Sequence, residues 1–383
     1  MPQLREQAGT SQMPYQLPYS GQNSDTAGKG NFFSTLHLRE LDDVSFPAFS
    51  KKSLSLIKKH LTLEIFNAIG RQKTDSGFTL ANAICSGLKN PDSSIGVYAG
   101  DAQSYQTFAL VLDPIISEYH GFLKGQKHLS DFAPLDLPFL DPEGIYIKST
   151  RIRVARNLKG FCFPGHMTLS QRYDLEKKII FALSHLNDIN KGHYISFEKK
   201  DKNILQQLKK ENLLFEKGDR FQDAAGINSD FPKCRGIFHS FDKKFIVWVN
   251  EEDHLRIISL AATSDLSSVY NRLSKALSWL NNHLDFAWDE TYGHLTSCPT
   301  NIGTAMRAGV HIRLEKLEQK KELLLELVRA YNLQIRGTSG EKTKVEASVF
   351  DISNRQRLGV TESMIIQNLH AGLLAIINAE KKL

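Results

Sequence analysis

Hydrophobic positions divide this chain into a polar beginning, a helical segment, a proline-rich segment and a long segment of mixed pattern. Residues 1–35 are rich in Gln, Ser, Gly and Pro and carry too few apolar side chains to repay the entropy lost on ordering, so they are predicted to form a mobile tail. Residues 36–128 are predicted to form a small helical domain because apolar residues recur there at intervals of three and four. This spacing is shown by Leu54, Ile57, Leu61, Ile65 and Ile69.

A proline-rich stretch follows the helical segment. Pro134, Pro138 and Pro142 lie there, and proline removes a backbone donor and opposes helix formation, so residues 129–145 are predicted to be a linker. Beyond it, residues 146–383 alternate short β-like runs with long amphipathic helices, which predicts a sheet covered by helices. The expected fold class is α+β, with a small all-α domain followed by a larger domain that contains the sheet.

Several elements of the larger domain can be predicted individually. Residues 236–240 and 245–249 are apolar runs separated by a short polar segment, as in two paired strands. Val310 and Ile312 alternate with polar neighbours, which is typical of a half-buried strand. Ser264 is a candidate N-cap for a helix. The apolar face of that helix is marked by Leu266, Tyr270, Leu273, Leu277 and Leu280, and that of a later helix by Leu317, Leu324, Val328 and Tyr331.

Composition narrows the class of protein. No run approaches the roughly 18 apolar residues that cross a bilayer, no signal-peptide pattern begins the sequence, and Pro2 stands where myristoylation requires glycine, so no membrane partner is expected. The four cysteines are widely spaced, which favours a reducing, cytoplasmic location over a zinc site or a disulfide framework. The net charge of +6 comes from 48 basic and 42 acidic residues spread along the chain, so no nucleic-acid partner is expected either.

Arginines are the candidates for binding phosphate. The chain has neither a P-loop nor the glycine-rich dinucleotide fingerprint, so a nucleotide would be held by side chains. A guanidinium takes two phosphate oxygens at once and stays charged. Arg151 and Arg153 lie two residues apart and would point the same way on a strand. The other candidates are Arg235, Arg256, Arg307 and Arg336. Each of these arginines, taken alone, fits a solvated surface position better.

Two carboxylates and a thiol are the candidates for holding a cation. Glu252 follows an apolar run and precedes Arg256 by four residues, and Glu341 lies on a glycine-rich loop. Cys298 lies in a tight turn nine residues before Arg307, and a functional thiol there would need nearby cations or hydroxyls to lower its pKa. A buried, unreactive cysteine and a solvated acidic turn are the alternative interpretations.

Six segments, in order along the chain, resemble the phosphagen (guanidino) kinase family, and most closely those members that act on arginine. They are STRIR at 149–153, RGIFH at 235–239, VWVNEEDHLR at 247–256, CPTNIGT at 298–304, RGTSGE at 336–341 and DISN at 351–354. The resemblance runs from about residue 45 to residue 383. It implies a helical N-terminal domain, an eight-stranded antiparallel sheet flanked by helices, and reversible, Mg²⁺-dependent phosphoryl transfer between ATP/ADP and a guanidine.

The resemblance also implies roles for the candidate residues. The ATP-binding positions correspond to Ser149, Arg151, Arg153, Arg235, Arg256, Arg307, His311 and Arg336. The positions implied in catalysis are Glu252, Cys298, Glu341, Arg256 and Arg307, and no residue is assigned as a metal ligand. Glu252 and Glu341 would clamp the guanidinium, with Cys298 as a thiolate that acts electrostatically and not as a nucleophile. A loose phosphoryl transition state needs mainly positioning and charge stabilisation, which arginines supply.

Substrate choice depends on a short loop of the helical domain. Residues 92–98 match the family loop that receives the amino-acid end of arginine, with Ser93, Ile95 and Tyr98 as candidate contacts. An ion pair of the family maps to Asp92 and Arg220. The implied partner is therefore free L-arginine, a small-molecule guanidine, bound by a monomer or a homodimer. The chain departs from the family pattern at Ser94, Asn212, Ser339 and Lys342.

Other functions fit these residues less well. The departures leave taurocyamine or glycocyamine open as substrates, whereas creatine is disfavoured because creatine kinases lack an equivalent of Glu341. A protein-arginine kinase of the same superfamily would lack the helical domain. An inactive nucleotide-binding scaffold would be expected to have lost Cys298, Glu252 or an arginine, and all are present. A nucleic-acid-binding protein would show a clustered basic face with interleaved aromatic residues, which the sequence does not have.

Overall fold

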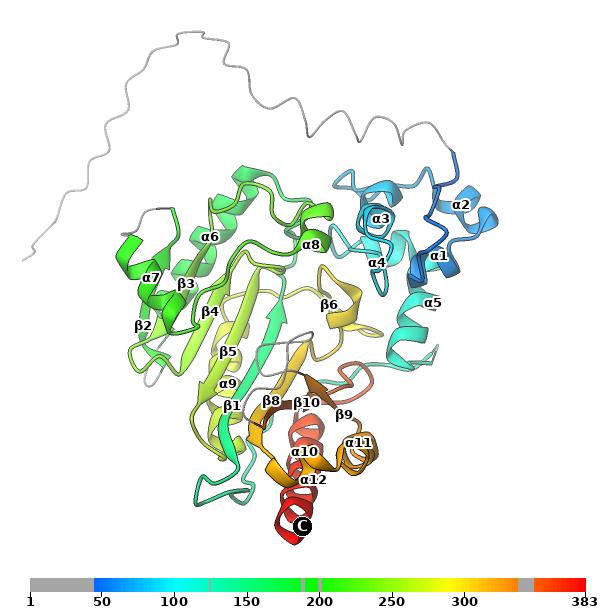
Figure 1. Cartoon of the computed structure of the whole chain (residues 1–383). Coiled ribbons are helices and arrows are strands. Elements are labelled where there is room, and N and C mark those ends of the chain that lie inside the picture. Colours follow the sequence, from blue (N-terminus) through cyan, green and yellow to red (C-terminus); the bar gives the residue numbers. More distant parts are fainter. Residues whose placement is uncertain (1–44, 124, 187–189, 199–201, 337–347) are drawn as a thin grey trace, which may run out of the picture. The chain divides into compact units, whose positions relative to one another are not determined.

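The computed structural model describes residues 45–383 except 124, 187–189, 199–201 and 337–347, so the predicted tail lies outside the described residues. The first described elements are five helices (Figure 1). They are α1 (Leu56–His60), α2 (Leu63–Ile69), α3 (Leu80–Lys89), α4 (Ser104–Thr107) and α5 (Ala109–His120). Their buried side chains form one apolar cluster that includes Ile57, Leu80 and Phe108. The expectation of a helical N-terminal part is confirmed.

One detail of the helical prediction is wrong. The positions from Leu54 to Ile69 do not share one helix. The first helix ends at His60, and Thr62 caps a second helix, because its side chain accepts a hydrogen bond from the amide of Ile65. Leu54 lies before α1 and is 91% exposed, whereas Ile57, the second residue of α1, is fully buried. A capping hydroxyl therefore interrupts an apolar pattern that would otherwise read as continuous.

An eight-stranded antiparallel sheet forms the second part of the chain (Figure 1). Its strand order is β2-β3-β4-β5-β1-β8-β10-β9, and every neighbouring pair is antiparallel. The strands are β1 (Ile147–Arg156), β2 (Gly192–Ser196), β3 (Gly236–Ser240), β4 (Phe245–Val249), β5 (Leu255–Ala261), β8 (Met306–Arg313), β9 (Leu333–Arg336) and β10 (Val349–Asn354). The predicted strands at 236–240, 245–249 and around Val310 are present, which confirms the α+β class.

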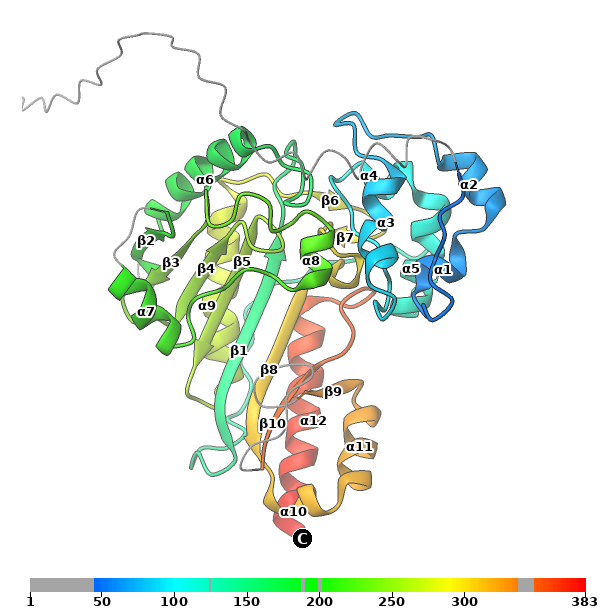
Figure 2. The same cartoon turned by 45° about the horizontal axis from the view of Figure 1, so that its top comes forward.

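Helices cover the sheet unequally. The remaining elements are α6 (Leu169–Ser184), α7 (Lys202–Lys210), α8 (Arg220–Ala224), α9 (Leu266–Asn281), α10 (Glu315–Gln319), α11 (Lys321–Ala330), α12 (Glu362–Lys382) and the short hairpin β6 (Trp288–Asp289) and β7 (Gly293–His294). Figure 2 shows α9 and α12 behind the sheet. Side chains of these two helices and of α6 pack with that face of the sheet into the largest apolar cluster. On the opposite face, a smaller cluster that includes Leu208 of α7 covers parts of the strands from β2 to β5. The candidate polar side chains lie on this face further along the sheet, on β1 and β8.

Two helix boundaries differ from the prediction. The N-cap of α9 is Asp265, whose carboxylate accepts from the amide of Ser268, while the Ser264 hydroxyl donates to the Asp141 carbonyl. The predicted helix from Leu317 to Tyr331 is two helices, α10 and α11, that meet at Lys320. No helix or strand lies in the predicted linker between α5 and β1, where the amides of Leu135 and Leu137 donate to side chains of α9. No helix in the described part of the chain is both long and apolar enough to cross a membrane.

Candidate active site

Strand alternation places the candidate arginines on the face of the sheet that α6, α9 and α12 leave uncovered. Arg153 of β1 lies opposite Arg307 of β8. Four residues earlier on β1, Ser149 lies opposite His311. Ala155 of β1 faces Arg256 of β5, so Arg256 shares the same face. The intervening residues, such as Ile152 and Val310, point the other way and are fully or almost fully buried. The sequence prediction that Arg151 and Arg153 point together is confirmed.

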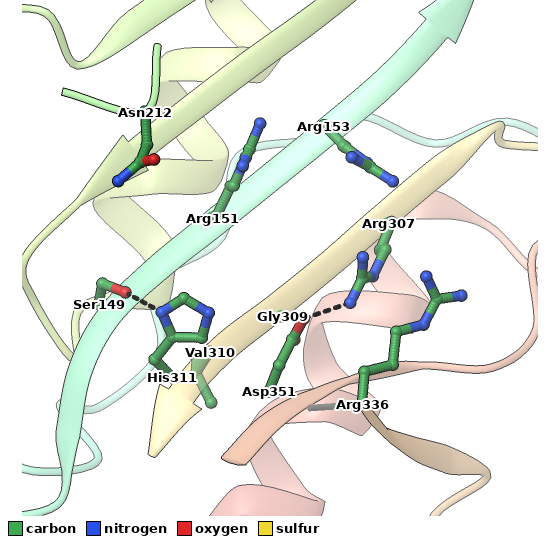
Figure 3. Close-up of a pocket in the computed structure, with 10 residues that line it drawn as sticks. All are labelled: Ser149, Arg151, Arg153, Asn212, Arg307, Gly309, Val310, His311, Arg336 and Asp351. Atoms are coloured by element: carbon green, nitrogen blue, oxygen red, sulfur yellow. Dashed lines mark hydrogen bonds and ion pairs between the residues drawn. The ribbon is translucent and has the colours of Figure 1, made fainter. Parts of the chain in front are cut away.

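These strands line a pocket of about 490 Å³ (Figure 3). Its lining consists of Ser149, Arg151, Arg153, Asn212, Arg307, Gly309, Val310, His311, Arg336 and Asp351. Figure 3 shows guanidinium groups entering the pocket from β1, β8 and β9. Gly309 leaves space in the pocket because it has no side chain. A Cβ at this position would lie 2.9 Å from the Cβ of Ser353, which is closer than normal packing allows. With four arginines and one aspartate, the pocket suits a polyphosphate anion.

Burial and the neighbouring positive charges lower the pKa values of Arg151 and Arg153. Burial lowers the pKa of Arg151 to about 10, and the nearby Arg256 and Arg307 act in the same direction. The pKa of Arg153 is also lowered by burial and by the same neighbours. Arg307 is held by Asp351, with 2.5 Å between Nη2 and Oδ2, and its Nε donates to the Ser353 hydroxyl at 3.2 Å. A polyanion in the pocket would relieve this repulsion.

Trp248 of β4 borders the arginines. The guanidinium carbons of Arg151 and Arg256 lie 5.6 and 5.7 Å from the centroids of its ring system. The indole Nε1 donates to the Leu213 carbonyl at 2.7 Å, which fixes the ring. The aromatic face therefore offers cation–π attraction to two crowded cations. Sequence reasoning did not single out Trp248, although it alternates with Val247 and Val249 in a strand otherwise composed of aliphatic residues and Phe245.

Arg235 is the one predicted ATP-binding arginine that lines neither this pocket nor the adjoining one near Arg256. Its side chain is 1% exposed, and its terminal nitrogens donate to the carbonyls of Lys233, Ile227 and Ser229. The guanidinium also lies over the ring of Phe231. In this arrangement Arg235 ties a loop together, so any contact with a nucleotide would require these bonds to exchange.

The acidic candidates lie beside Arg256. Its Nη1 donates to Glu251 Oε1 at 2.9 Å and its Nη2 to Glu252 Oε2 at 3.1 Å. Glu252 is 8% exposed, and burial raises its pKa to about 7, although Arg256 acts in the opposite direction. Asn301 Nδ2 also lies 3.4 Å from Glu252 Oε2. This carboxylate is therefore poorly compensated, which suits it to accept a cation from outside.

Cys298 precedes a single 3₁₀ turn, Pro299–Asn301, within reach of Glu252. Its Sγ lies 3.1 Å from the Thr300 hydroxyl. Burial and the charge of Glu252 raise the pKa of the thiol to about 12. The predicted thiolate is thus not favoured by these surroundings, because the Thr300 hydroxyl does not offset burial. A bound cation would lower the pKa by direct attraction.

The backbone around Cys298 is anchored from several directions. Asp253 Oδ1 accepts from the amide of Ser297 at 2.7 Å and from Asn157 Nδ2 at 2.7 Å. From the helical part, the amide of Ala99 donates to the Ser297 carbonyl at 2.8 Å, and the hydroxyl of Tyr105 donates to the carbonyl of Thr296 at 2.7 Å. The segment carrying Ser93, Ile95 and Tyr98 therefore runs directly into contact with the Cys298 turn.

The three candidate substrate contacts are placed differently. Tyr98 is partly exposed, and its pKa is raised by burial and then by the charges of Cys298 and Glu252. The Ser93 hydroxyl accepts from the amide of Gly96 at 3.0 Å. Ile95 packs into the helical core at 3% exposure and leaves only its backbone for a ligand. The expected ion pair is present, with Arg220 Nη2 bonded to Asp92 Oδ2.

Glu341, Ser339 and Lys342 lie outside the described residues, so the second predicted carboxylate has no described position. Among the described residues, no group of three or more His, Cys, Asp or Glu side chains could hold a metal ion. Mg²⁺ commonly binds through phosphate oxygens and water, with few protein ligands, so a site built mainly from arginines fits a metal that arrives with the nucleotide.

Several residues that build the site were not among the predicted site residues, although the sequence drew attention to Glu251 and Asp253 as part of an acidic cluster and to Thr300 as a hydroxyl near Cys298. The residues that were not predicted are Trp248, Glu251, Asp253, Thr300, Asn301, Asp351 and Arg357. Asp351 and Asn301 lie inside recognisable motifs, so proximity along the chain could have drawn attention to them. Arg357 lies 59 residues after Cys298, and no spacing in the sequence relates the two.

Comparisons with known proteins identify the family. Residues 174–383 match the ATP:guanido phosphotransferase C-terminal catalytic domain, and residues 51–117 match the N-terminal domain of the same family. An arginine kinase of Limulus polyphemus is 45% identical over 330 residues, covering 85% of this chain and 92% of that protein. An arginine kinase of Anthopleura japonica is 44% identical over 333 residues and 85% of this chain, which spans only 46% of that longer relative.

Solved structures give the same result. A lombricine kinase superposes with a TM-score of 0.84 at 32% identity, covering 88% of this chain and 94% of its own. The duplicated taurocyamine kinase of Schistosoma mansoni, with bound transition-state analogue components, gives a TM-score of 0.81 at 36% identity, covering 91% of this chain and 48% of its own. The arginine-lined pocket beside a buried glutamate and thiol thus sits in a chain that belongs to the ATP:guanido phosphotransferase family, the phosphagen kinases.

Proposed function

We propose that this protein transfers the γ-phosphoryl group of Mg-ATP reversibly to the guanidine group of free L-arginine. The observation that carries the proposal is the arrangement of four arginines from β1, β8 and β9 next to a buried, undercompensated carboxylate and a thiol. One half of the site attracts a polyanion, and the other half attracts a flat cation. The forward reaction forms a phosphorus–nitrogen bond, releases ADP and frees one proton from the guanidinium.

The nucleotide half would be supplied by the arginines. Arg151, Arg153, Arg307 and Arg336 would hold the phosphates from three sides, and Arg256 would reach the transferring group from β5. Mg²⁺ would enter with ATP and neutralise part of the phosphate charge. Because the transition state is loose, fixed positive charge around the moving phosphoryl group is the main contribution that these side chains make. Ser149, His311 and Asn212 line the same pocket at its other end and would contact the remainder of the nucleotide.

The guanidine half would be supplied by Glu252 and Cys298, with Glu341 as the second carboxylate. Glu252 would orient the plane of the guanidinium, and the bound cation would lower the pKa of the Cys298 thiol from its raised value of about 12. Fixing this plane aims one nitrogen at the γ-phosphorus, so much of the rate enhancement would come from alignment. The loop with Ser93 and Tyr98 would contact the amino-acid end of the substrate.

A different guanidine is the second candidate substrate. The solved relatives include enzymes named for lombricine and taurocyamine, and Ser94 departs from the family pattern in the loop proposed to select the substrate. Ser94 is exposed, whereas Ile95 beside it is buried, so a change at position 94 can alter selection without altering the fold. The reaction class is the same for either substrate.

The test is ADP formation from Mg-ATP by the purified protein with L-arginine, taurocyamine, glycocyamine and lombricine offered separately. The proposal predicts the highest kcat/KM with L-arginine. Higher kcat/KM with another guanidine would retain the mechanism and reject arginine as the substrate. Cys298→Ala serves as the control for contaminating ATPase, because its turnover should fall strongly with the fold preserved. No guanidine-dependent ADP from the wild-type protein would reject the proposed function.

A further inference from the structure

Arg357 borders both the arginines of the phosphate half and the Cys298 turn of the guanidine half. It follows β10, two residues after the exposed Arg355, and its guanidinium lines the small pocket that also contains Arg153, Arg256 and Arg307. Its own hydrogen bonds, however, go to the turn that carries Cys298. Nη1 donates to the Thr300 carbonyl at 2.8 Å and to Asn301 Oδ1 at 2.9 Å.

Both bonds lead to groups proposed to hold the guanidine. The Thr300 hydroxyl lies 3.1 Å from the Cys298 sulfur, and Arg357 fixes the carbonyl of the same threonine. Asn301 donates its backbone amide to the Cys298 carbonyl at 2.9 Å. Because Arg357 engages the side-chain oxygen of Asn301, the amide nitrogen is turned towards Glu252 Oε2, 3.4 Å away. One guanidinium thus orients the surroundings of both the thiol and the carboxylate.

The backbone of Arg357 is fixed to the same turn. Its carbonyl accepts from the amide of Thr304 at 3.0 Å and from the Thr304 hydroxyl at 3.1 Å. Gly303 passes so close that a Cβ there would lie 2.3 Å from this carbonyl oxygen, and its φ of +92° also favours glycine. These contacts fix the backbone of Arg357 against the turn, which limits how far its guanidinium can move.

We propose that Arg357 is a positioning residue that orients the Cys298–Asn301 turn and, through the Asn301 amide, the Glu252 carboxylate for guanidine binding. The kinetic test of this proposal depends on the proposed function, whereas the test by alkylation of Cys298 does not. Charge adds to the geometry, since burial, Arg336 and Arg307 lower the pKa of Arg357 while Tyr119 and then Cys298 act to raise it. By reciprocity, the guanidinium favours the thiolate.

The test compares Arg357→Ala and Arg357→Lys with Arg355→Ala, a matched control on the same segment whose side chain is exposed. The first readout needs no substrate: the rate of iodoacetamide alkylation at Cys298, resolved from the other three cysteines by peptide mass spectrometry. Removing the charge in Arg357→Ala should slow alkylation about tenfold at a fixed pH, equivalent to one pKa unit. Slower alkylation in Arg357→Ala that Arg357→Lys restores reports the lost charge, because both variants lose the guanidinium and only the lysine keeps a positive charge. Arg357→Lys should retain most of the rate.

The second readout is the KM for L-arginine against the KM for ATP. Losing two charge-assisted bonds should raise the KM for arginine about 10- to 100-fold in Arg357→Ala, with a smaller effect on ATP. Arg357→Lys should recover part of this loss, and combining Arg357→Ala with Asn301→Ala should cost less than the product of the two single effects. If Arg357→Ala does not fold, Arg357→Lys carries the kinetic test alone.

Three results would overturn the proposal. One is a wild-type value for either readout in Arg357→Ala, or for the arginine KM in Arg357→Lys if only that variant folds. Another is a larger loss for ATP than for arginine, because Arg357 would then be a phosphate ligand. The third is strict additivity with Asn301→Ala. If the wild-type protein turns over no guanidine, the proposed function fails and the alkylation rate alone decides the role of Arg357.

Discussion

At the scale of single residues, the site works by leaving charges incompletely compensated. Glu252 keeps one guanidinium partner, Arg256, which it shares with Glu251, and burial still raises its pKa to about 7. The ordinary glutamate value is about 4.3. A carboxyl group held in this state gains more from a bound cation than an exposed one would, because the desolvation cost has already been met by the fold.

Guanidine binding should therefore weaken as pH falls through about 7. Below this pKa Glu252 becomes neutral and no longer attracts the guanidinium, which stays charged throughout. We expect the KM for L-arginine in the free enzyme to rise up to about tenfold per pH unit below 7. The measurement is KM between pH 6 and 8. Glu252→Gln is the control, with a high KM that does not change over this range; a pH-dependent KM in that variant would assign the titration to another group.

The same carboxyl group should affect stability with the opposite trend. Its folded-state pKa is raised above the unfolded value, so its favourable contribution is present below about pH 4.3 and is lost as pH rises through about 7. Glu252→Gln should remove this contribution. Denaturant unfolding of both proteins at pH 5 and pH 7.5 measures it, and the variant should gain stability relative to the wild type at the higher pH.

At the scale of elements, the alternation of side chains along strands explains what sequence could predict. Arg151 and Arg153 were expected to share a face, and Val310 was expected to be buried, because a strand period of two is local information. The opposition of Arg153 and Arg307 is not local. It depends on the register between β1 and β8, which are separated by about 150 residues, and only pairing in three dimensions fixes it.

The predicted start of α9 was wrong for a related reason. Ser264 and Asp265 are both good N-cap residues, and sequence gives no rule to choose between neighbours. Ser264 is drawn away by the carbonyl of Asp141, which lies 123 residues earlier, so Asp265 caps α9. The role of Arg235 stays a prediction, since its motif identified it and the structure gives its guanidinium three nearby backbone carbonyl partners.

The cap assignment can be measured. Asp265→Ala should reduce the free energy of unfolding by about 1 kcal/mol, because the amide of Ser268 loses its acceptor at the first turn of α9. Asp265→Asn is the matched control and should retain most of the stability, since asparagine caps helices equally well. Urea denaturation of the three proteins tests this. A loss of similar size in Asp265→Asn would show that charge, and not capping, accounts for the effect.

Gly309 tests whether the floor of the phosphate pocket must stay empty. A Cβ on this strand residue would lie 2.9 Å from the Cβ of Ser353 and 3.2 Å from Asp351 Oδ1, so the partner of Arg307 would be displaced. We expect Gly309→Ala to raise the KM for ATP about tenfold and Gly309→Val to raise it further, with a smaller change for the guanidine. Steady-state kinetics with each substrate varied measures this. Equal changes in both KM values would indicate general disruption.

At the scale of the whole described chain from residue 45 onwards, the helical part and the sheet part share a core. The apolar cluster of the helices includes Cys298, Ile302 and Leu358, which come from the segments that surround the candidate active site. Ala99 and Tyr105 add hydrogen bonds to the same region. The exposed ion pair of Asp92 and Arg220, with about half of each side chain in solvent, contributes little by comparison. Burial of apolar surface is therefore the main connection between the parts.

This connection predicts that the two parts unfold together. Leu358 is fully buried in the helical cluster although it follows β10, so Leu358→Ala should cost about 2–5 kcal/mol and affect both parts. All three tryptophans, Trp248, Trp279 and Trp288, lie in the sheet part, so their fluorescence reports that part while far-ultraviolet circular dichroism is weighted towards helices.

The two probes should give coincident urea transitions in the wild type, and both should move to the same lower midpoint in Leu358→Ala. Leu374→Ala, on α12 with 43% of its side chain exposed, is the matched control and should shift neither. Transitions that separate in the variant, with circular dichroism lost first, would mean that the sheet part is stable without the helices. Because the Cys298 turn belongs to the shared cluster, the guanidine half of the site would then lose its support before the phosphate half.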